Sequence, residues 1–343
     1  MDFAELLQDV ERFAVPPEPL TARLQEILAP SQLSDIPEGV RLPVHFVDGA
    51  VAVEQTDAVC LIAAVACAVT TSSSSVALPV VTAEAAIPVG GDSERFRSLL
   101  MAHCELEAAV ATPGLVVVDG GLVTSLLAVA SAPLIRDADV RASALRFTKR
   151  RGTLEAVAGY LDKVLSGQVV ALPKQDTAQA YTSRWLTHPD LQAEAQSLVR
   201  FRDRPLIQAL LRPGELLAPR DATEARRTKA AGDEDTDLGQ FGIAVDDQLA
   251  RLRAAQGLIV AYFKPHAGAQ RTIKFETNAV AEETAGRIAA AMSAEADSPT
   301  VMEPFGQHLV DRLCKVEVRA HLRSLTAAVA SSSVHDQGHR YRT

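Results

Sequence analysis

Apolar residues follow two different spacings along the chain, and the change from one to the other predicts its secondary structure. Recurrence every three or four positions predicts helices, and continuous runs rich in β-branched residues predict strands. The helices are expected at residues 2–14, 20–29, 93–110, 122–132, 152–166, 279–294 and 304–325. The strands are expected within residues 41–87, at 115–118 and 144–147, and as a hairpin of 258–264 with 272–276. Strands interspersed with amphipathic helices predict a mixed α/β protein, in which helices flank a sheet.

Two of the predicted strands share an ending. Residues 45–50 read HFVDGA and residues 115–122 read LVVVDGGL, so each apolar run ends in Val-Asp-Gly. Asp-Gly after such a run is a strong signal for a hairpin turn, and either copy alone is well explained in that way. If the two strands are neighbours, however, Asp48 and Asp119 lie side by side. Paired carboxylates on a sheet suit a divalent metal ion.

The helix between these strands offers a third carboxylate. Glu105 lies one residue past the apolar face of the 93–110 helix, where its side chain can reach over the edge of a sheet. Glu107, half a turn further round, competes with it, and an ordinary solvated glutamate is the alternative for both.

The carboxylates occur in an informative order: strand-Asp, hairpins, helix-Glu, strand-Asp and, much later, a terminal helix that carries His308. The ribonuclease H-like fold assembles its metal centre in this order. We therefore predict a ribonuclease H-like mixed sheet flanked by helices, with N-terminal helices and helical additions. Its centre would hold two Mn²⁺ or Mg²⁺ ions, which are hard cations that prefer oxygen ligands. His308 would serve as an outer ligand or as a proton donor.

The composition narrows the class of protein without changing this prediction. The 343 residues are 48% hydrophobic but only 4% aromatic, so the core is expected to consist of alanine, valine and leucine. A net charge of −9 argues against general coating of nucleic acid but leaves room for a local basic groove. The four cysteines have no CxxC spacing, which favours buried free thiols over a zinc site. The acidic N-terminus is unlike a signal peptide, and the longest apolar run, 58–70, is too short to span a bilayer, so we expect a cytoplasmic protein without a membrane segment.

Candidates for DNA contact lie in two places. Lys149, Arg150 and Arg151 form a dense positive cluster directly after a predicted strand. They either grip phosphates or form a solvated strand end, and the sequence leaves both alternatives open. Tyr262 and Lys264 lie in the predicted hairpin. Tyr262, Phe263 or Trp185 could stack on the bases of a single strand, although core packing is the favoured role for at least two of the three.

The pattern divides the chain into three parts. Residues 1–40 are expected to form an N-terminal helical segment, 41–330 the ribonuclease H-like nuclease domain, and 331–343 a disordered tail. Within the domain, residues 219–237 are highly charged and offer no evident core residue. This stretch is therefore predicted to be a charged surface insertion.

Several of these segments also resemble a known family. VHFVDGA, RSLLMAHCELEAA, LVVVDGGL, the segment ending in FTKR, the YFK…KFE hairpin and EPFGQH are similar, in this order, to successive motifs of the NurA nucleases. The resemblance implies a Mn²⁺- or Mg²⁺-dependent DNA nuclease with 5′-to-3′ exonuclease activity and endonuclease activity on single strands. It also implies a homodimer that works on DNA ends with the hexameric, DNA-translocating HerA ATPase. The implied processes are end resection, double-strand break repair and homologous recombination.

The resemblance assigns roles to individual residues. The family's metal-site aspartates correspond to Asp48 and Asp119, its helix glutamate to Glu105, its lysine to Lys149 and its C-terminal histidine to His308. Lys149 would neutralise charge on the phosphate or orient the attacking water.

The chain departs from the family pattern at two turn positions. The family usually has Asp-Gly-Ser after both strands, whereas Ala50 and Gly121 occupy the third positions here. The interval between the helix glutamate and the second aspartate is also shorter than in the family, which keeps Glu107 in competition.

A rival hypothesis of a different class is a non-catalytic ribonuclease H-like scaffold that binds DNA and an ATPase. An ATPase activity of the chain itself is excluded by the lack of a GxxxxGK[ST] phosphate-binding loop.

Overall fold

The computed structural model describes most of the chain. The described residues are 15–40, 42–56, 59–70, 79–89, 93–173, 179–222, 229–230, 235–266, 271–279, 282–296 and 303–331. The helix predicted at 2–14 and the tail from residue 332 onward lie outside these ranges. No helix among the described residues is both long enough and apolar enough to cross a membrane.

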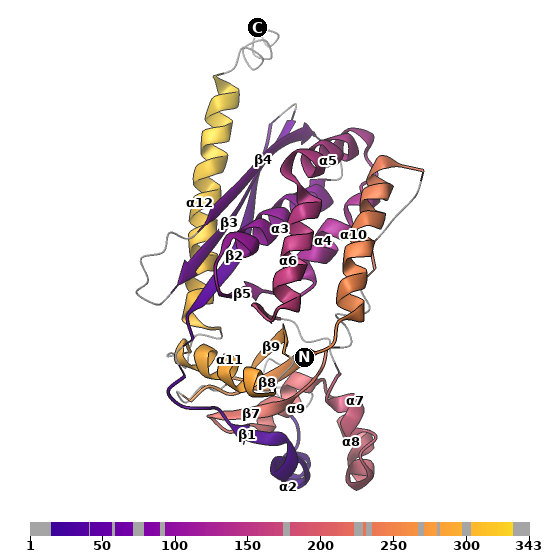
Figure 1. Ribbon diagram of the computed structural model, residues 1–343, viewed down its shortest axis with the longest axis vertical. Coiled ribbons are helices and arrows are strands. Elements are labelled where there is room, and N and C mark those ends of the chain that lie inside the picture. The colour runs from indigo at the N-terminus through magenta and orange to yellow at the C-terminus, as the bar shows by residue number, and fades with distance from the viewer. Residues whose placement is uncertain are drawn as a thin grey trace, which may run out of the picture.

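The described strands form one mixed sheet of nine strands in the order β1-β7-β8-β9-β6-β5-β2-β3-β4 (Figure 1). β2 is parallel to β5, and β5 is parallel to β6, whereas the other neighbours are antiparallel. The strands are β1 Leu33–Asp35, β2 Val44–Gln55, β3 Val59–Thr70, β4 Val80–Pro88, β5 Leu115–Asp119, β6 Val169–Leu172, β7 Glu215–Asp221, β8 Leu258–Phe263 and β9 Ile273–Asn278.

Helices cover both faces of this sheet. One face carries α3 Ser93–Ala111, α4 Thr124–Ala130, α5 Ala138–Arg151, α6 Thr153–Leu165 and α10 Asp237–Ala254, and the other carries α11 Glu282–Ala294 and α12 Phe305–Ala330. The end of the sheet formed by β1 and β7 is packed with α2 Glu18–Gln32, α7 Thr182–Trp185, α8 Ala195–Leu198 and α9 Asp203–Leu210. The 3₁₀ turns Ala132–Leu134 and Pro189–Glu194 complete the described elements.

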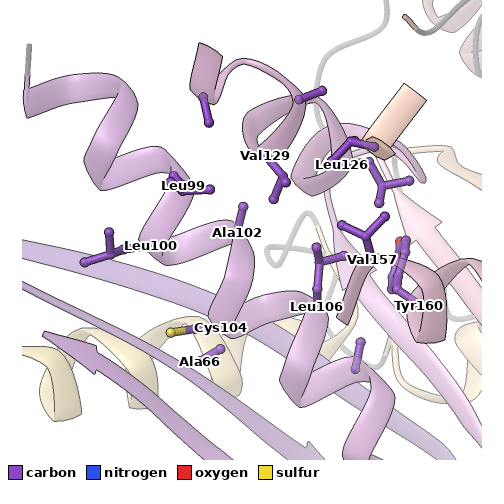
Figure 2. Packing of buried hydrophobic residues seen from close by; sticks show 14 of the residues in the cluster. Ala66, Leu99, Leu100, Ala102, Cys104, Leu106, Leu126, Val129, Val157 and Tyr160 are labelled. Atoms are coloured by element: carbon purple, nitrogen blue, oxygen red, sulfur yellow. The ribbon is translucent and has the colours of Figure 1, made fainter. Parts of the chain in front are cut away.

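The strands β4-β3-β2-β5-β6 have the topology of the ribonuclease H-like fold. Three antiparallel strands are followed by a helix, and two parallel strands are then added beside the first of the three. The predicted fold class is therefore confirmed. Figure 2 shows the core on the α3 side, where side chains of α3, α4 and α6 meet, among them Leu106, Val129 and Tyr160.

The prediction that Asp-Gly marks a turn was wrong at its first occurrence. β2 runs straight through Asp48 and Gly49, which pair with Cys67 and Ala66 of β3. The chain instead reverses between Gln55 and Val59. A paired neighbour along the whole strand overrides the local turn preference of Asp-Gly, because every backbone group in the strand then has a partner.

The strand predicted at 144–147 was also wrong, because this segment belongs to helix α5. The Asp137 side chain caps the helix by accepting hydrogen bonds from the N–H groups of Asp139 and Val140. The helix ends at Gly152, whose φ of 62° suits a glycine C-cap. Lys149, Arg150 and Arg151 occupy its last turn, where positive charge is favourable.

The insertion at 219–237 contains buried residues, contrary to expectation. β7 continues to Asp221, and Ala222 and Ala230 are buried against the core. Helix α10, which follows directly, was not predicted, although its buried side chains have helical spacing. The expectation of buried free thiols is confirmed for all four cysteines.

Candidate metal centre

The two aspartates lie at matching positions on neighbouring parallel strands. Val47 of β2 pairs with Val118 of β5, and an aspartate comes next in each strand. Asp48 lies within a strand that continues for seven more residues to Gln55, whereas Asp119 is the last residue of its strand. Each carboxylate accepts a hydrogen bond from the following glycine N–H, at 2.8 Å for Asp48 and 2.9 Å for Asp119.

Glu105 reaches the same place from helix α3. Its side chain lies against Gly49, where a Cβ atom would be 2.6 Å from Glu105 Oε1. The absence of a side chain at Gly49 is what allows this approach. Ser125 of α4 donates a hydrogen bond to Glu105 Oε2 at 2.5 Å, which fixes the direction of the carboxylate.

Glu107, the competing glutamate, lies elsewhere. Its Oε2 is 3.0 Å from an Arg151 guanidinium nitrogen and 2.9 Å from His103 Nε2. It therefore ties α3 to α5, and Glu105 is the helix glutamate that lies against Gly49, the residue after Asp48.

Burial and nearby negative charge raise the cost of ionising Asp48 and Glu105. Burial, together with the charges of Asp119 and Glu105, raises the pKa of Asp48 to about 8. Burial also raises the pKa of Glu105 to about 7, with a contribution from Asp119 that the hydrogen bond from Ser125 opposes. A bound divalent cation would relieve this repulsion, and an all-oxygen donor set suits Mn²⁺ or Mg²⁺. The chemistry of the residues thus fits the predicted metal.

The side chains are not already in a coordinating arrangement. Within the part of the chain that the structure describes, no three His, Cys, Asp or Glu side chains are grouped closely enough to hold a metal ion. Each of the three carboxylates instead accepts a hydrogen bond from a nearby N–H or O–H group.

His308 lies half-buried in the first turns of α12, which packs on β2. The contact is close at Gly306, which lies directly against the ring of Phe46. One turn beyond His308, Asp311 adds a further negative charge that raises the pKa of Asp48. Asp311 was missed in the sequence, because its neighbours gave no reason to distinguish it from a solvated helix residue.

The predicted DNA contacts have different surroundings. Lys149 is exposed on α5, with its Nζ 3.4 Å from Asp237 Oδ2 of α10. Arg150 and Arg151 line a groove of about 550 Å³ between α5 and the edge strand β4. Lys264 donates a hydrogen bond to the carbonyl oxygen of Leu211.

The prediction that Tyr262 stacks on DNA bases was wrong, because its ring is buried. Tyr262 is 0% exposed and packs edge-on against Tyr181, 5.5 Å between ring centroids. Phe263 and Trp185 are also 0% exposed. Their low exposure follows from their position in cores on either face of the sheet.

A fourth carboxylate was missed by sequence reasoning. Glu276 of β9 accepts a hydrogen bond from the N–H of Leu122, three residues after Asp119, at 3.2 Å. The signal was present in the KFE motif, where Lys274 and Glu276 alternate with a buried phenylalanine and so share one face of the strand.

Comparisons with known proteins agree on the architecture. The sequence matches no protein-family model and no curated protein. Among solved structures, the NurA nuclease from Sulfolobus solfataricus superposes with a TM-score of 0.56 and 12% identity, over 96% of this chain and 94% of that one. A structure of NurA with manganese superposes with a TM-score of 0.51 and 12% identity, over 90% of this chain and 92% of that one. Another NurA structure superposes with a TM-score of 0.51 and 11% identity, over 97% of this chain and 99% of that one. The chain therefore has the fold of the NurA nucleases along nearly its whole length.

Proposed function

We propose that the chain is a metal-dependent deoxyribonuclease. It would hydrolyse phosphodiester bonds in an active site formed by Asp48, Glu105 and Asp119. The observation that carries this proposal is the strand register that places Asp48 and Asp119 at matching positions on adjacent strands, with Glu105 against Gly49 and the pKa of Asp48 raised to about 8. Such crowding is costly for stability and is typical of sites that bind cations or perform acid–base chemistry. The NurA fold, found in a structure solved with manganese, supports the same proposal.

Two Mn²⁺ or Mg²⁺ ions, when bound, would supply an activated water and neutralise charge on the scissile phosphate. Asp48 and Asp119 would hold the ions from adjacent strands. Glu105 would complete the carboxylate set, oriented by Ser125. His308 on α12 would be an outer ligand or would donate a proton to the leaving oxygen.

We further propose that the substrate is single-stranded DNA and the ends of double-stranded DNA, cleaved by 5′-to-3′ exonuclease and by endonuclease activity. The groove between β4 and α5 supports a path for the DNA backbone, since Arg146, Arg150 and Arg151 line it. Lys149 lies on the same helix, and Lys264 is a further candidate contact.

The proposed biological setting is DNA end resection in double-strand break repair and homologous recombination, inside the cytoplasm. The chain would act as a homodimer with a hexameric ATPase of the HerA type. The resemblance of the sequence motifs and the shared fold support this assignment. Sedimentation of the chain alone, and of the chain mixed with such an ATPase, tests both partners.

A cleavage assay on end-labelled single- and double-stranded DNA, with Mn²⁺, Mg²⁺ or EDTA, tests the proposed chemistry. Asp48→Asn and Asp119→Asn should abolish cleavage and leave the fold intact. Asp162→Asn is the matched control, because Asp162 is an exposed aspartate on α6 that pairs with Arg251. Full activity of either site variant would refute the assignment. DNA binding by the wild type without metal-dependent cleavage would favour the scaffold hypothesis instead.

A further inference from the structure

The strand β9 brings a buried ion pair to the edge of the proposed site. Ala171 of β6 pairs with Glu276 of β9 on one side, and Val118 of β5 pairs with Ala171 on the other. Glu276 therefore lies level with Val118, the residue before Asp119, with only strand β6 between them. Sequence reasoning assigned it no role.

Glu276 holds the turn that follows Asp119. Its Oε2 accepts the hydrogen bond from Leu122 N at 3.2 Å, and a Cβ atom at Gly121 would lie 3.3 Å from the same oxygen. On the other side of Leu122, the carbonyl oxygen accepts a hydrogen bond from the Tyr160 hydroxyl at 3.1 Å. Both backbone groups of Leu122 are therefore fixed by side chains from other elements.

Lys274 in turn fixes Glu276. Its side chain is only 3% exposed, and its Nζ lies 3.5 Å from Glu276 Oε1 and 6.0 Å from the centre of the Tyr262 ring. A buried ammonium group needs a negative partner, so the ion pair holds the Glu276 carboxylate in one orientation. With Oε1 facing Lys274, Oε2 remains directed at the turn.

Gly121 lies close to this carboxylate. A Cβ atom at position 121 would lie 3.3 Å from Glu276 Oε2, which is tighter than ordinary contact, so the carboxylate would have to move by a few tenths of an ångström. The glycine and the Lys274–Glu276 pair are therefore parts of one arrangement.

We propose that Glu276, held by Lys274, is a positioning residue that sets the direction of Asp119 in the metal centre. This inference rests on the proposed nuclease function. Asp119 is at the end of its strand, so the turn that follows decides where its carboxylate points. A displacement of about 1 Å at such a group can lower the rate by roughly a hundredfold.

Glu276→Gln tests the proposal, because it keeps the size of the side chain but removes the charge that faces Lys274. We expect kcat to fall at least tenfold and the dissociation constant for Mn²⁺ alone, followed by electron paramagnetic resonance, to rise at least threefold. KM for DNA should not change. Glu215→Gln is the matched control, since Glu215 also accepts a hydrogen bond from a loop N–H, that of Arg212, but in the β7 region.

Tyr160→Phe provides a second test that removes only one hydroxyl from the same turn. It should change kcat and Mn²⁺ binding in the same direction by a smaller factor. In an Asp119→Asn background, Glu276→Gln should have no further effect on Mn²⁺ binding, because it acts through Asp119.

The outcomes separate this inference from the proposed function. A wild type that cleaves DNA with Mn²⁺, combined with a Glu276→Gln variant of unchanged kcat and Mn²⁺ affinity, overturns the positioning role alone. Additive effects of Glu276→Gln and Asp119→Asn on Mn²⁺ binding also overturn it. A wild type that shows no metal-dependent cleavage overturns the nuclease proposal and this inference with it.

Discussion

Glu105 occupies the space that a side chain at Gly49 would need, with a Cβ there 2.6 Å from Glu105 Oε1 and 2.7 Å from Glu105 Cγ. Helix α3 and strand β2 therefore approach closely enough to bring Glu105 beside Asp48. Gly49, which in the sequence suggested a turn, lies within a regular strand, and its lack of a side chain leaves room for the Glu105 carboxylate.

Gly49→Ala should lower both activity and stability. The added methyl group would meet Oε1 and Cγ of Glu105, so this side chain must change its rotamer and give up the hydrogen bond from Ser125, and the free energy of unfolding should fall by about 1–3 kcal/mol. The displaced carboxylate should lower kcat roughly tenfold or more. A double-mutant cycle with Glu105→Ala checks the cause: in that background Gly49→Ala should have no further effect on kcat. A second large loss there would contradict the contact.

The raised pKa values of Asp48 and Glu105 predict that stability without metal falls as the pH rises. Both carboxyl groups bind a proton more tightly in the folded than in the unfolded state, because folding raises the pKa of Asp48 to about 8 and that of Glu105 to about 7. Their stabilising contribution is therefore complete below their ordinary pKa and is lost as the pH rises through the folded values. In EDTA, Tm should drop by about 3 °C or more between pH 5 and pH 8.

Two comparisons test the origin of this drop. Asp48→Asn should reduce it, because the amide does not ionise, and Mn²⁺ at pH 8 should reverse it in the wild type but not in the variant. Asp162→Asn, with its exposed carboxylate, should keep the wild-type profile. An equal drop in Asp48→Asn would show that other groups are responsible.

His308→Ala should impair turnover rather than binding. The half-buried side chain lies on a helix packed against β2, so its loss should remove a ligand or a proton donor without opening the DNA groove. We expect kcat to fall roughly a hundredfold, which is typical of a lost general acid, with an unchanged Kd for DNA in fluorescence anisotropy. His188→Ala, at the start of the 3₁₀ turn Pro189–Glu194, is the control. A defect in Kd alone would identify His308 as a phosphate contact.

Lys149→Ala should affect DNA affinity rather than chemistry. Its Nζ is paired with Asp237 on the surface and its side chain is 68% exposed. Loss of one phosphate contact should lower the slope of log affinity against log salt by about 1, with kcat unchanged. Asp237→Asn breaks the same ion pair without removing the cation and should leave the affinity undiminished. A loss of kcat in Lys149→Ala would instead support the catalytic role implied by the family resemblance.

The sequence sufficed for the parts of the fold that depend on local pattern. Apolar runs located β2, β5 and the β8–β9 hairpin, and helical spacing located α3 and α12. The order of the acidic residues then predicted the sheet topology. The structure brings Asp48, Asp119 and Glu105 into one region, as expected, although their role as metal ligands stays a prediction.

The rest depended on long-range contacts that local pattern does not contain. Pairing with β3 keeps β2 straight at Asp48-Gly49. The caps at Asp137 and Gly152 make residues 144–147 helical, despite their apolar run. Glu276 reaches the turn after Asp119 across 154 residues of sequence. A single sequence offers no way to pair positions so far apart.

The pairing of β2 along its whole length also gives the two aspartates unequal mechanical support. Release of Asp48 requires the hydrogen bonds to β3 to break on both sides of it, from His45 to Gln55, and this amounts to opening the sheet. Asp119 is paired with Leu172 of β6 at the very end of its strand, and its direction also depends on the turn that Glu276 and Tyr160 hold. Amide hydrogen exchange should therefore be slower around Asp48 than at Asp119 and the turn behind it.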